Sequence, residues 1–97
     1  MAHYIRALQP DELVPYMTGM LQGDAETINQ FAEDGDMELN CTYYGKLIRT
    51  IHLLRDMGKV IEALEDVDEQ GLTRIGRIVV DCEVIFDESK EEQGNAE

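Results

Sequence analysis

Few side chains in this sequence have the types and spacing that catalysis or metal binding requires. His52 lies eleven residues after Cys41, about 16 Å along a helix, which is too far for the two to share a zinc ion. The acidic segment 34–40 has the alternating oxygen ligands of a calcium loop, but that loop needs glycine at its sixth position and glutamate at its twelfth. Leu39 and Gly45 occupy those positions. The sequence therefore predicts no metal site and no cofactor.

Glu62 and Glu65 form an ExxE pair that could do chemistry if both lay on one helix face. The pair is similar to the first of two carboxylate pairs, ExxE and ExxD, with which all-α nucleotide pyrophosphohydrolases of the MazG type hold Mg²⁺. The second pair is missing here, because Glu83 is followed three positions later by Phe86. The chain also contains no glycine-rich phosphate loop and no plausible nucleophile–base spacing. We therefore expect a protein that is not an enzyme, with a pyrophosphohydrolase of this type as a remote alternative.

Charge is the most unusual property of the chain. Its 97 residues carry a formal net charge of −13. Residues 1–45 hold eight acids against one arginine, 46–59 are net basic, and 60–97 hold twelve acids against three basic residues. Such a surface repels phosphate backbones and anionic lipids and attracts basic partners. We expect a protein partner with a basic surface, and no direct binding to nucleic acid or to membranes.

Hydrophobic periodicity predicts an all-α fold. Apolar residues in 44–67 recur at spacings of three and four, which predicts one long helix with an apolar face wide enough for two neighbours. Segment 72–88 fits a helical period throughout, whereas strand alternation fits only 77–86. We therefore predict a second amphipathic helix there that pairs with the long one as a hairpin. A strand over 77–86 is the alternative.

Two short helices are expected before the long one. The first begins at Asp11 and ends at Gly23, and the second ends at Gly35. The long helix then starts after a cap at Asp36, which we favour slightly, or at Asn40.

Residues 1–89 are thus expected to form a single domain, a small helical bundle, followed by a disordered acidic tail over 90–97. The N-terminal segment has no basic region followed by an apolar one, and no apolar run reaches the roughly 20 residues of a membrane span. The expected compartment is the cytoplasm. There Cys41 and Cys82 would be reduced, partly buried thiols.

We predict that the acids on either side of the basic segment form a surface that binds a partner protein. They are Asp24, Glu26, Glu33, Asp34, Asp36, Glu38, Glu62, Glu65, Asp66, Asp68 and Glu69. In composition the chain is analogous to DNA mimics such as phage-encoded anti-restriction and anti-CRISPR proteins, inhibitors that block a basic nucleic-acid-binding surface. In the alternative, the acidity serves only solubility, and the chain is a helical adaptor or homo-oligomeric subunit that binds through apolar helix faces.

Two further groups of residues suggest self-association. Val80 and Val84 fall outside the main apolar arc of the predicted last helix, so a second face of that helix could form a homodimer. Arg49, Arg55 and Lys59 form a basic strip on the predicted long helix. The strip either balances acids of the same chain or contacts an acidic partner, including a second copy.

Overall fold

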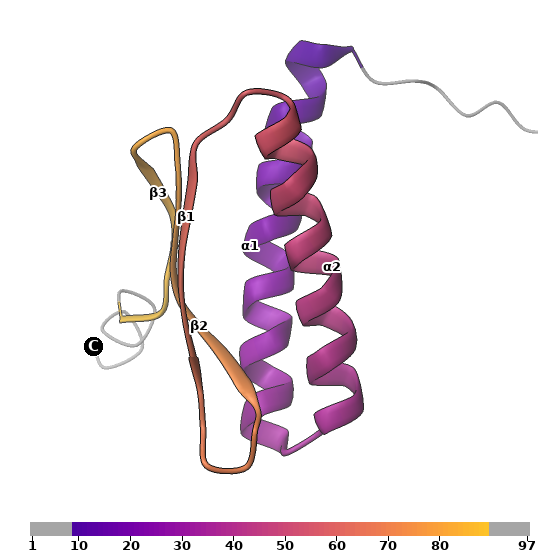
Figure 1. Cartoon of the computed structure of the whole chain (residues 1–97), viewed down its shortest axis with the longest axis vertical. Helices are drawn as coiled ribbons and strands as arrows, with labels where there is room; N and C mark the ends of the chain where they lie inside the picture. Colours follow the sequence, from indigo (N-terminus) through magenta and orange to yellow (C-terminus); the bar gives the residue numbers. More distant parts are fainter. Residues whose placement is uncertain (1–8, 90–97) are drawn as a thin grey trace, which may run out of the picture.

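The computed structural model describes residues 9–89, and these form two helices followed by a three-stranded antiparallel sheet (Figure 1). The elements are α1 (Pro10–Asp34), α2 (Met37–Asp56), β1 (Ile61–Val67), β2 (Thr73–Val80) and β3 (Glu83–Asp87), and the strand order is β1-β2-β3. The fold is therefore α+β, and the prediction of an all-α bundle with four helices is wrong. The tail predicted for 90–97 lies outside the described residues. Neither described helix is long and apolar enough to cross a membrane.

The two short helices predicted at the N-terminus are one continuous helix, α1. Glycine inside a helix costs about 1 kcal/mol relative to alanine, and Gly23 is tolerated because the apolar face continues past it. The buried residues of that face are Met17, Leu21, Ala25, Ile28 and Ala32. Helix α1 ends where the sequence predicted, at Gly35, whose positive φ of 73° suits the left-handed conformation of a helix end.

Helix α2 begins at the earlier of the two predicted starts. The side chain of Asp36 accepts a hydrogen bond of 3.1 Å from the backbone N–H of Leu39, as a helix cap does. The helix ends at Asp56, however, well before the predicted end at residue 67. Gly58, with φ of +87°, redirects the chain into β1. The apolar period of 44–67 therefore spans a helix and a strand.

The predicted helix over 72–88 is a β-hairpin. Asp81 and Cys82 have φ of 49° and 69°, and positive φ at both central residues is what a twisted two-residue hairpin turn requires. Gly76 has no partner on β1 and Ile85 has none on β2, so each is the extra residue of a bulge. The bulge at Gly76 lets residues three positions apart both face inward, which imitates a helical period.

Helix α1 packs against α2 on one side and against β2 and β3 on the other, while β1 is the outer strand (Figure 1). All these packed elements contribute to one core. Its largest fully buried hydrophobic side chains are Leu21, Ile28, Leu47, Leu54, Leu72, Ile75 and Ile78. Strand β1 contributes little, since only Ile61 is even partly buried.

Two helix asparagines complete the open edge of β2, whose N-terminal half has no β3 residue beside it. Asn29 of α1 donates to the carbonyl of Ile75 at 2.9 Å and accepts from its N–H at 2.7 Å. Asn40 of α2, fully buried, does the same for Thr73 at 2.9 and 3.0 Å and also donates to the carbonyl of Ile28 at 3.0 Å. The side-chain amides thus take the place of a neighbouring strand.

Candidate binding surfaces

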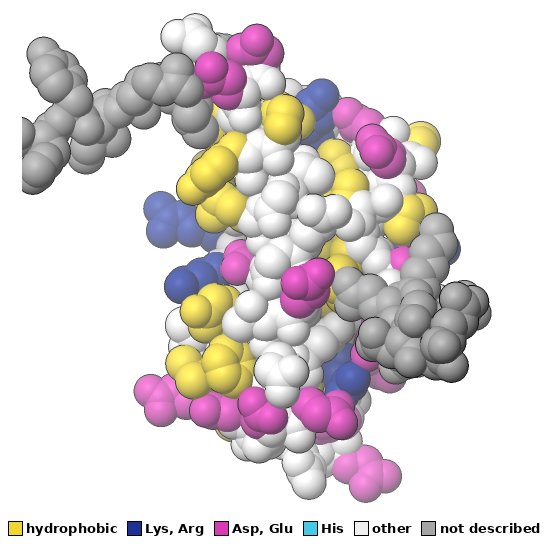
Figure 2. Space-filling view, turned by 180° about the vertical axis from the view of Figure 1, so that it is seen from behind, with side chains coloured by type: hydrophobic (Ala, Val, Ile, Leu, Met, Phe, Trp, Pro, Cys, Tyr) yellow, Lys and Arg dark blue, Asp and Glu magenta, His cyan; other side chains and the backbone are white. Residues whose placement is uncertain are grey.

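The fold brings much of the predicted acidic surface to one end of the molecule, where the α1–α2 turn and the β1–β2 turn lie close together (Figure 1). The methyl group of Met37 lies 3.4 Å from the position that a Cβ atom on Gly71 would occupy. We call this region the acidic end. It consists of Glu33, Asp34, Asp36, Glu38, Asp66, Asp68 and Glu69. From behind, a row of acidic side chains crosses the lower end with a basic side chain beside it, and both acidic and basic side chains lie higher up (Figure 2).

Some carboxylates of the acidic end also hold the turns in place. Asp36 caps α2, and Asp68 accepts backbone N–H groups of Gln70 and Leu72 at 2.9 and 3.0 Å within the β1–β2 turn. Because these bonds use backbone donors, the two carboxylates are held in fixed positions.

Three other acids of this end, Asp34, Glu38 and Glu69, are exposed and form no ion pair with a described residue. Asp34 accepts only a hydrogen bond of 3.1 Å from Gln30. Their charges are therefore available to a partner.

Arg74 is the cation at this end, and the sequence did not reveal its role. Its Nη1 and Nη2 donate to Glu33 at 3.1 Å and to Glu88 at 2.7 Å. The hydrogen bond to Glu88, followed by that to Glu33, raises the pKa of the guanidinium. Arg74 joins the end of α1 to the segment after β3. The two acids lie 41 and 14 positions from it in the chain, so no local pattern could have identified them.

Four of the predicted acids lie outside the acidic end. Glu26 is exposed on α1. Burial raises the pKa of Asp24, and the charge of Lys46 on α2 acts in the opposite direction. Glu62 and Glu65, the remaining two, are on β1.

The ExxE pair is split between the two faces of the sheet. Glu65 is opposite buried Ile75, whereas Glu62 is opposite Val79 on the outer face. On opposite faces the two carboxylates do not converge on one ion, so the expected arrangement of this pair on one helix face is wrong. Among the described residues, no group of three His, Cys, Asp or Glu side chains could hold a metal ion.

Tyr44 on α2 connects with β1 through Glu65. The hydrogen bond from its hydroxyl to the Glu65 carboxylate, together with burial and the carboxylate charge, raises the pKa of Tyr44 to about 12. A raised tyrosine pKa stabilises the fold at pH values below the ordinary value of 10.0, and this contribution is lost as the pH rises through about 12. Glu65→Gln should therefore bring the pKa of Tyr44 back toward 10.0, which an alkaline titration of phenolate absorbance would measure.

Tyr43→Phe is the control for that titration, because Tyr43 stacks on Phe31 and lies under Lys46 without contacting Glu65. The tyrosine of high pKa should persist in Tyr43→Phe and disappear in Tyr44→Phe. If Glu65→Gln left the highest tyrosine pKa in the titration unchanged, the assignment of that pKa to Tyr44 beside Glu65 would be contradicted.

The residues predicted for self-association do not form one surface. Val80 is buried and Val84 is 42% exposed on the opposite face of the sheet. Their expected shared helix face therefore does not exist, because both lie on strands. Cys41 and Cys82 are exposed free thiols, which corrects the expected partial burial.

The basic strip is divided between two roles. Lys59 forms an ion pair of 3.2 Å with Asp81. The pKa of Asp81 is lowered first by the N–H of Val60, which donates to it at 2.9 Å, and then by Lys59. Arg49 and Arg55 pair with no acid in the described part of the chain. Lys59 thus balances charge within the molecule, and the two arginines remain available.

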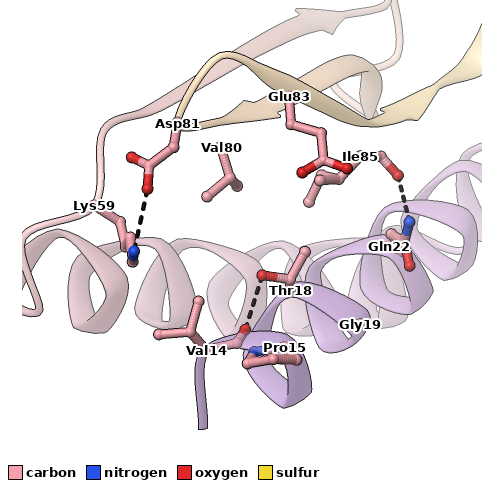
Figure 3. Close-up of a pocket in the computed structure, with 10 residues that line it drawn as sticks. All are labelled: Val14, Pro15, Thr18, Gly19, Gln22, Lys59, Val80, Asp81, Glu83 and Ile85. Atoms are coloured by element: carbon pink, nitrogen blue, oxygen red, sulfur yellow. Dashed lines mark hydrogen bonds and ion pairs between the residues drawn. The ribbon is translucent and has the colours of Figure 1, made fainter. Parts of the chain in front are cut away.

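A hollow of about 460 Å³ lies between the first half of α1 and the β2–β3 hairpin (Figure 3). Val80 lies on its sheet side, and the rim carries Lys59, Asp81 and Glu83. Its polar helix side chains are already engaged, since Thr18 donates to the carbonyl of Val14 at 2.8 Å and Gln22 to that of Ile85 at 2.6 Å. The hollow can accept an apolar group, but its lining contains no histidine or cysteine.

Comparison of the chain with protein-family models, with curated proteins and with solved structures found no match.

Proposed function

We propose that this chain is a non-enzymatic binding protein that blocks a basic, nucleic-acid-binding surface of a partner protein. The observation that carries the proposal is the acidic end. Two turns more than thirty residues apart in the chain place seven carboxylates at one end of the molecule, and Arg74 is the basic residue among them. The available arginines, Arg49 and Arg55, lie on α2 outside the acidic end.

The mechanism is electrostatic and steric. The carboxylates bind the basic groove of the partner in place of DNA phosphates. The folded chain then fills the groove and excludes nucleic acid. A dense patch of negative charge attracts a basic surface and accelerates association, and salt weakens this effect. The chain would act as a DNA-mimic inhibitor of the kind that phages direct against restriction or CRISPR systems.

A displacement experiment tests the proposal directly. Proteins of a bacterial lysate are bound to immobilised duplex DNA, and the amount released by the added chain is measured at low and at high salt. We expect release at low salt that declines at high salt. The triple variant Asp34→Asn, Glu38→Gln and Glu69→Gln should need about tenfold more protein for equal release, at roughly 0.5 kcal/mol for each lost charge contact.

The matched control removes three charges elsewhere, through Glu26→Gln, Asp56→Asn and Glu83→Gln. Both triple variants have the same net charge, so they separate a localised surface from overall acidity. The control should release proteins within about twofold of the unaltered chain. Equal losses in both variants would overturn the assignment to the acidic end and attribute release to overall acidity. No release by the unaltered chain would overturn the proposal and favour acidity that serves solubility alone.

A further inference from the structure

Strand β1 is an edge strand that the rest of the described chain leaves open. It lies at the outside of the sheet, and six of its seven residues are exposed. Proteins usually protect such an edge with charged side chains, especially lysine, or with proline, a bulge or a covering loop, because unpaired backbone groups attract another strand. The charges on β1 are all negative, so they oppose an acidic strand but not a basic one. Segment 61–67 contains neither lysine nor proline, and the unpaired bulge residue Gly76 belongs to β2.

Along its open side, β1 has three alternate residues whose backbone groups could form hydrogen bonds with an added strand. Every second residue of this segment hydrogen-bonds to the neighbouring β2 side of the sheet. At one end the C=O of Val60 accepts from the N–H of Asp81, and at the other end the N–H of Asp68 donates to the C=O of Leu72. The N–H and C=O groups of the residues between them point outward. Those residues are Ile61, Ala63 and Glu65, and a fourth, Val67, has its N–H bonded to the side chain of Asp66.

The side chains along this edge combine apolar and acidic character. Leu64 and Val67 are 62% and 58% exposed. Leu64 also lines two hollows, of about 510 and 230 Å³, on the side toward β2, where Arg74 and Arg77 contribute to the lining. Segment 61–69 also carries five acids and no basic residue. An incoming strand therefore meets apolar contacts and a negative potential together.

A second copy of this chain is a poor occupant of the edge. An antiparallel pair of β1 strands would bring two acidic edges together, and in the register centred on Leu64 it would place Glu62 opposite Asp66 twice. Like charges directly opposite one another destabilise a strand pair, whereas opposite charges contribute roughly 0.2–1 kcal/mol for each pair. The edge instead suits a strand with lysine or arginine at alternate positions and apolar residues between them.

We infer that β1 is a docking edge for a basic extended segment of a partner protein, which adds to the sheet as a fourth strand. The inference rests on the proposed function, because it gives the same basic partner a second contact. Backbone hydrogen bonds along the edge fix the added segment, and Glu62 and Asp66 select for its positive side chains. Since β1 leads into Asp68 and Glu69, one partner can contact the edge and the acidic end together.

The probe for this edge is a capped peptide of alternating lysine and valine. Its binding to the full chain is measured by fluorescence anisotropy, and amide hydrogen exchange is followed at Ile61, Ala63 and Glu65. We expect exchange at these amides to slow when the peptide binds. A peptide of the same sequence that is N-methylated at its central amides keeps its charge but cannot donate, and it should bind at least about tenfold more weakly.

A pair of variants gives the same test from the side of the protein. Ala63→Pro removes one outward N–H while leaving the bonds to β2 intact, because that group does not face β2. Ala63→Val keeps the N–H and is the matched control. We expect about a tenfold loss of peptide affinity for Ala63→Pro and less than twofold for Ala63→Val, with circular dichroism and thermal unfolding confirming that both are folded.

The outcomes separate this inference from the proposed function. Equal binding of the plain and methylated peptides, with no effect of Ala63→Pro, would overturn the docking edge and leave the acidic surface standing. Equal binding of a threonine–valine peptide would overturn the requirement for a basic segment. Absence of binding, or a dimer in sedimentation that protects the three amides, would also overturn the inference, while DNA displacement tests the proposed function separately.

Discussion

Replacing Asn40 by alanine should lower the free energy of unfolding by about 4 kcal/mol. The fully buried side chain makes three hydrogen bonds, two of them to the backbone of Thr73. Without the amide, the partly buried N–H and C=O of Thr73 have no strand to pair with, and the C=O of Ile28 loses a buried bond. Each unsatisfied buried group costs about 1–3 kcal/mol. The higher helix propensity of alanine recovers less than about 0.7 kcal/mol. Denaturant unfolding followed by circular dichroism would measure the loss.

Gln30→Ala is the control for Asn40→Ala, because Gln30 is also a helix amide but makes one exposed hydrogen bond, to Asp34. We expect its effect to stay below about 0.5 kcal/mol. Asn29→Ala, whose amide bonds to Ile75 in a partly buried position, should lie between the two. An Asn40→Ala loss below about 1 kcal/mol would show that water or a backbone shift satisfies Thr73.

The second large effect is expected from Val80→Asp, compared with the same change at Val84. Val80 is buried on the face of the sheet that packs on the helices, whereas Val84 is 42% exposed on the other face. An aspartate at position 80 would lose the core packing of Val80 and place a carboxylate beside the hollow that Lys59 borders, at a cost of about 3 kcal/mol. At position 84 only strand propensity and a contact with Val79 are lost, roughly 1 kcal/mol or less.

The two aspartate variants have equal net charge and equal composition, so a difference in their unfolding midpoints depends only on location. If both positions lay on one exposed helix face, the two substitutions would have small and similar effects. Similar midpoints for Val80→Asp and Val84→Asp would therefore contradict the strand assignment and the placement of Val80 in the core.

The candidate site was predictable only in part. Segregation of charge is a property of the sequence, and it identified the acids at 33–38 and 66–69 as members of one negative surface. Their arrangement at one end depends on the β1–β2 turn lying beside the α1–α2 turn, which an all-α bundle would not produce. The open edge of β1 was not predicted at all, because Ile61 and Leu64 continue the apolar period of the helix before them.

The sequence by itself determined the local signals of the N-terminal half: the glycine that ends α1 at Gly35, the cap at Asp36 and the apolar period through the first part of α2. These features depend on neighbours within one or two turns. Only the tertiary structure decided the state of 61–87. Strand pairing there depends on partners distant in the chain and on two bulges, which break the alternation of apolar residues so that it resembles a helical period. It also depends on Asn29 and Asn40, whose side chains hydrogen-bond to the backbone of β2 from the helices.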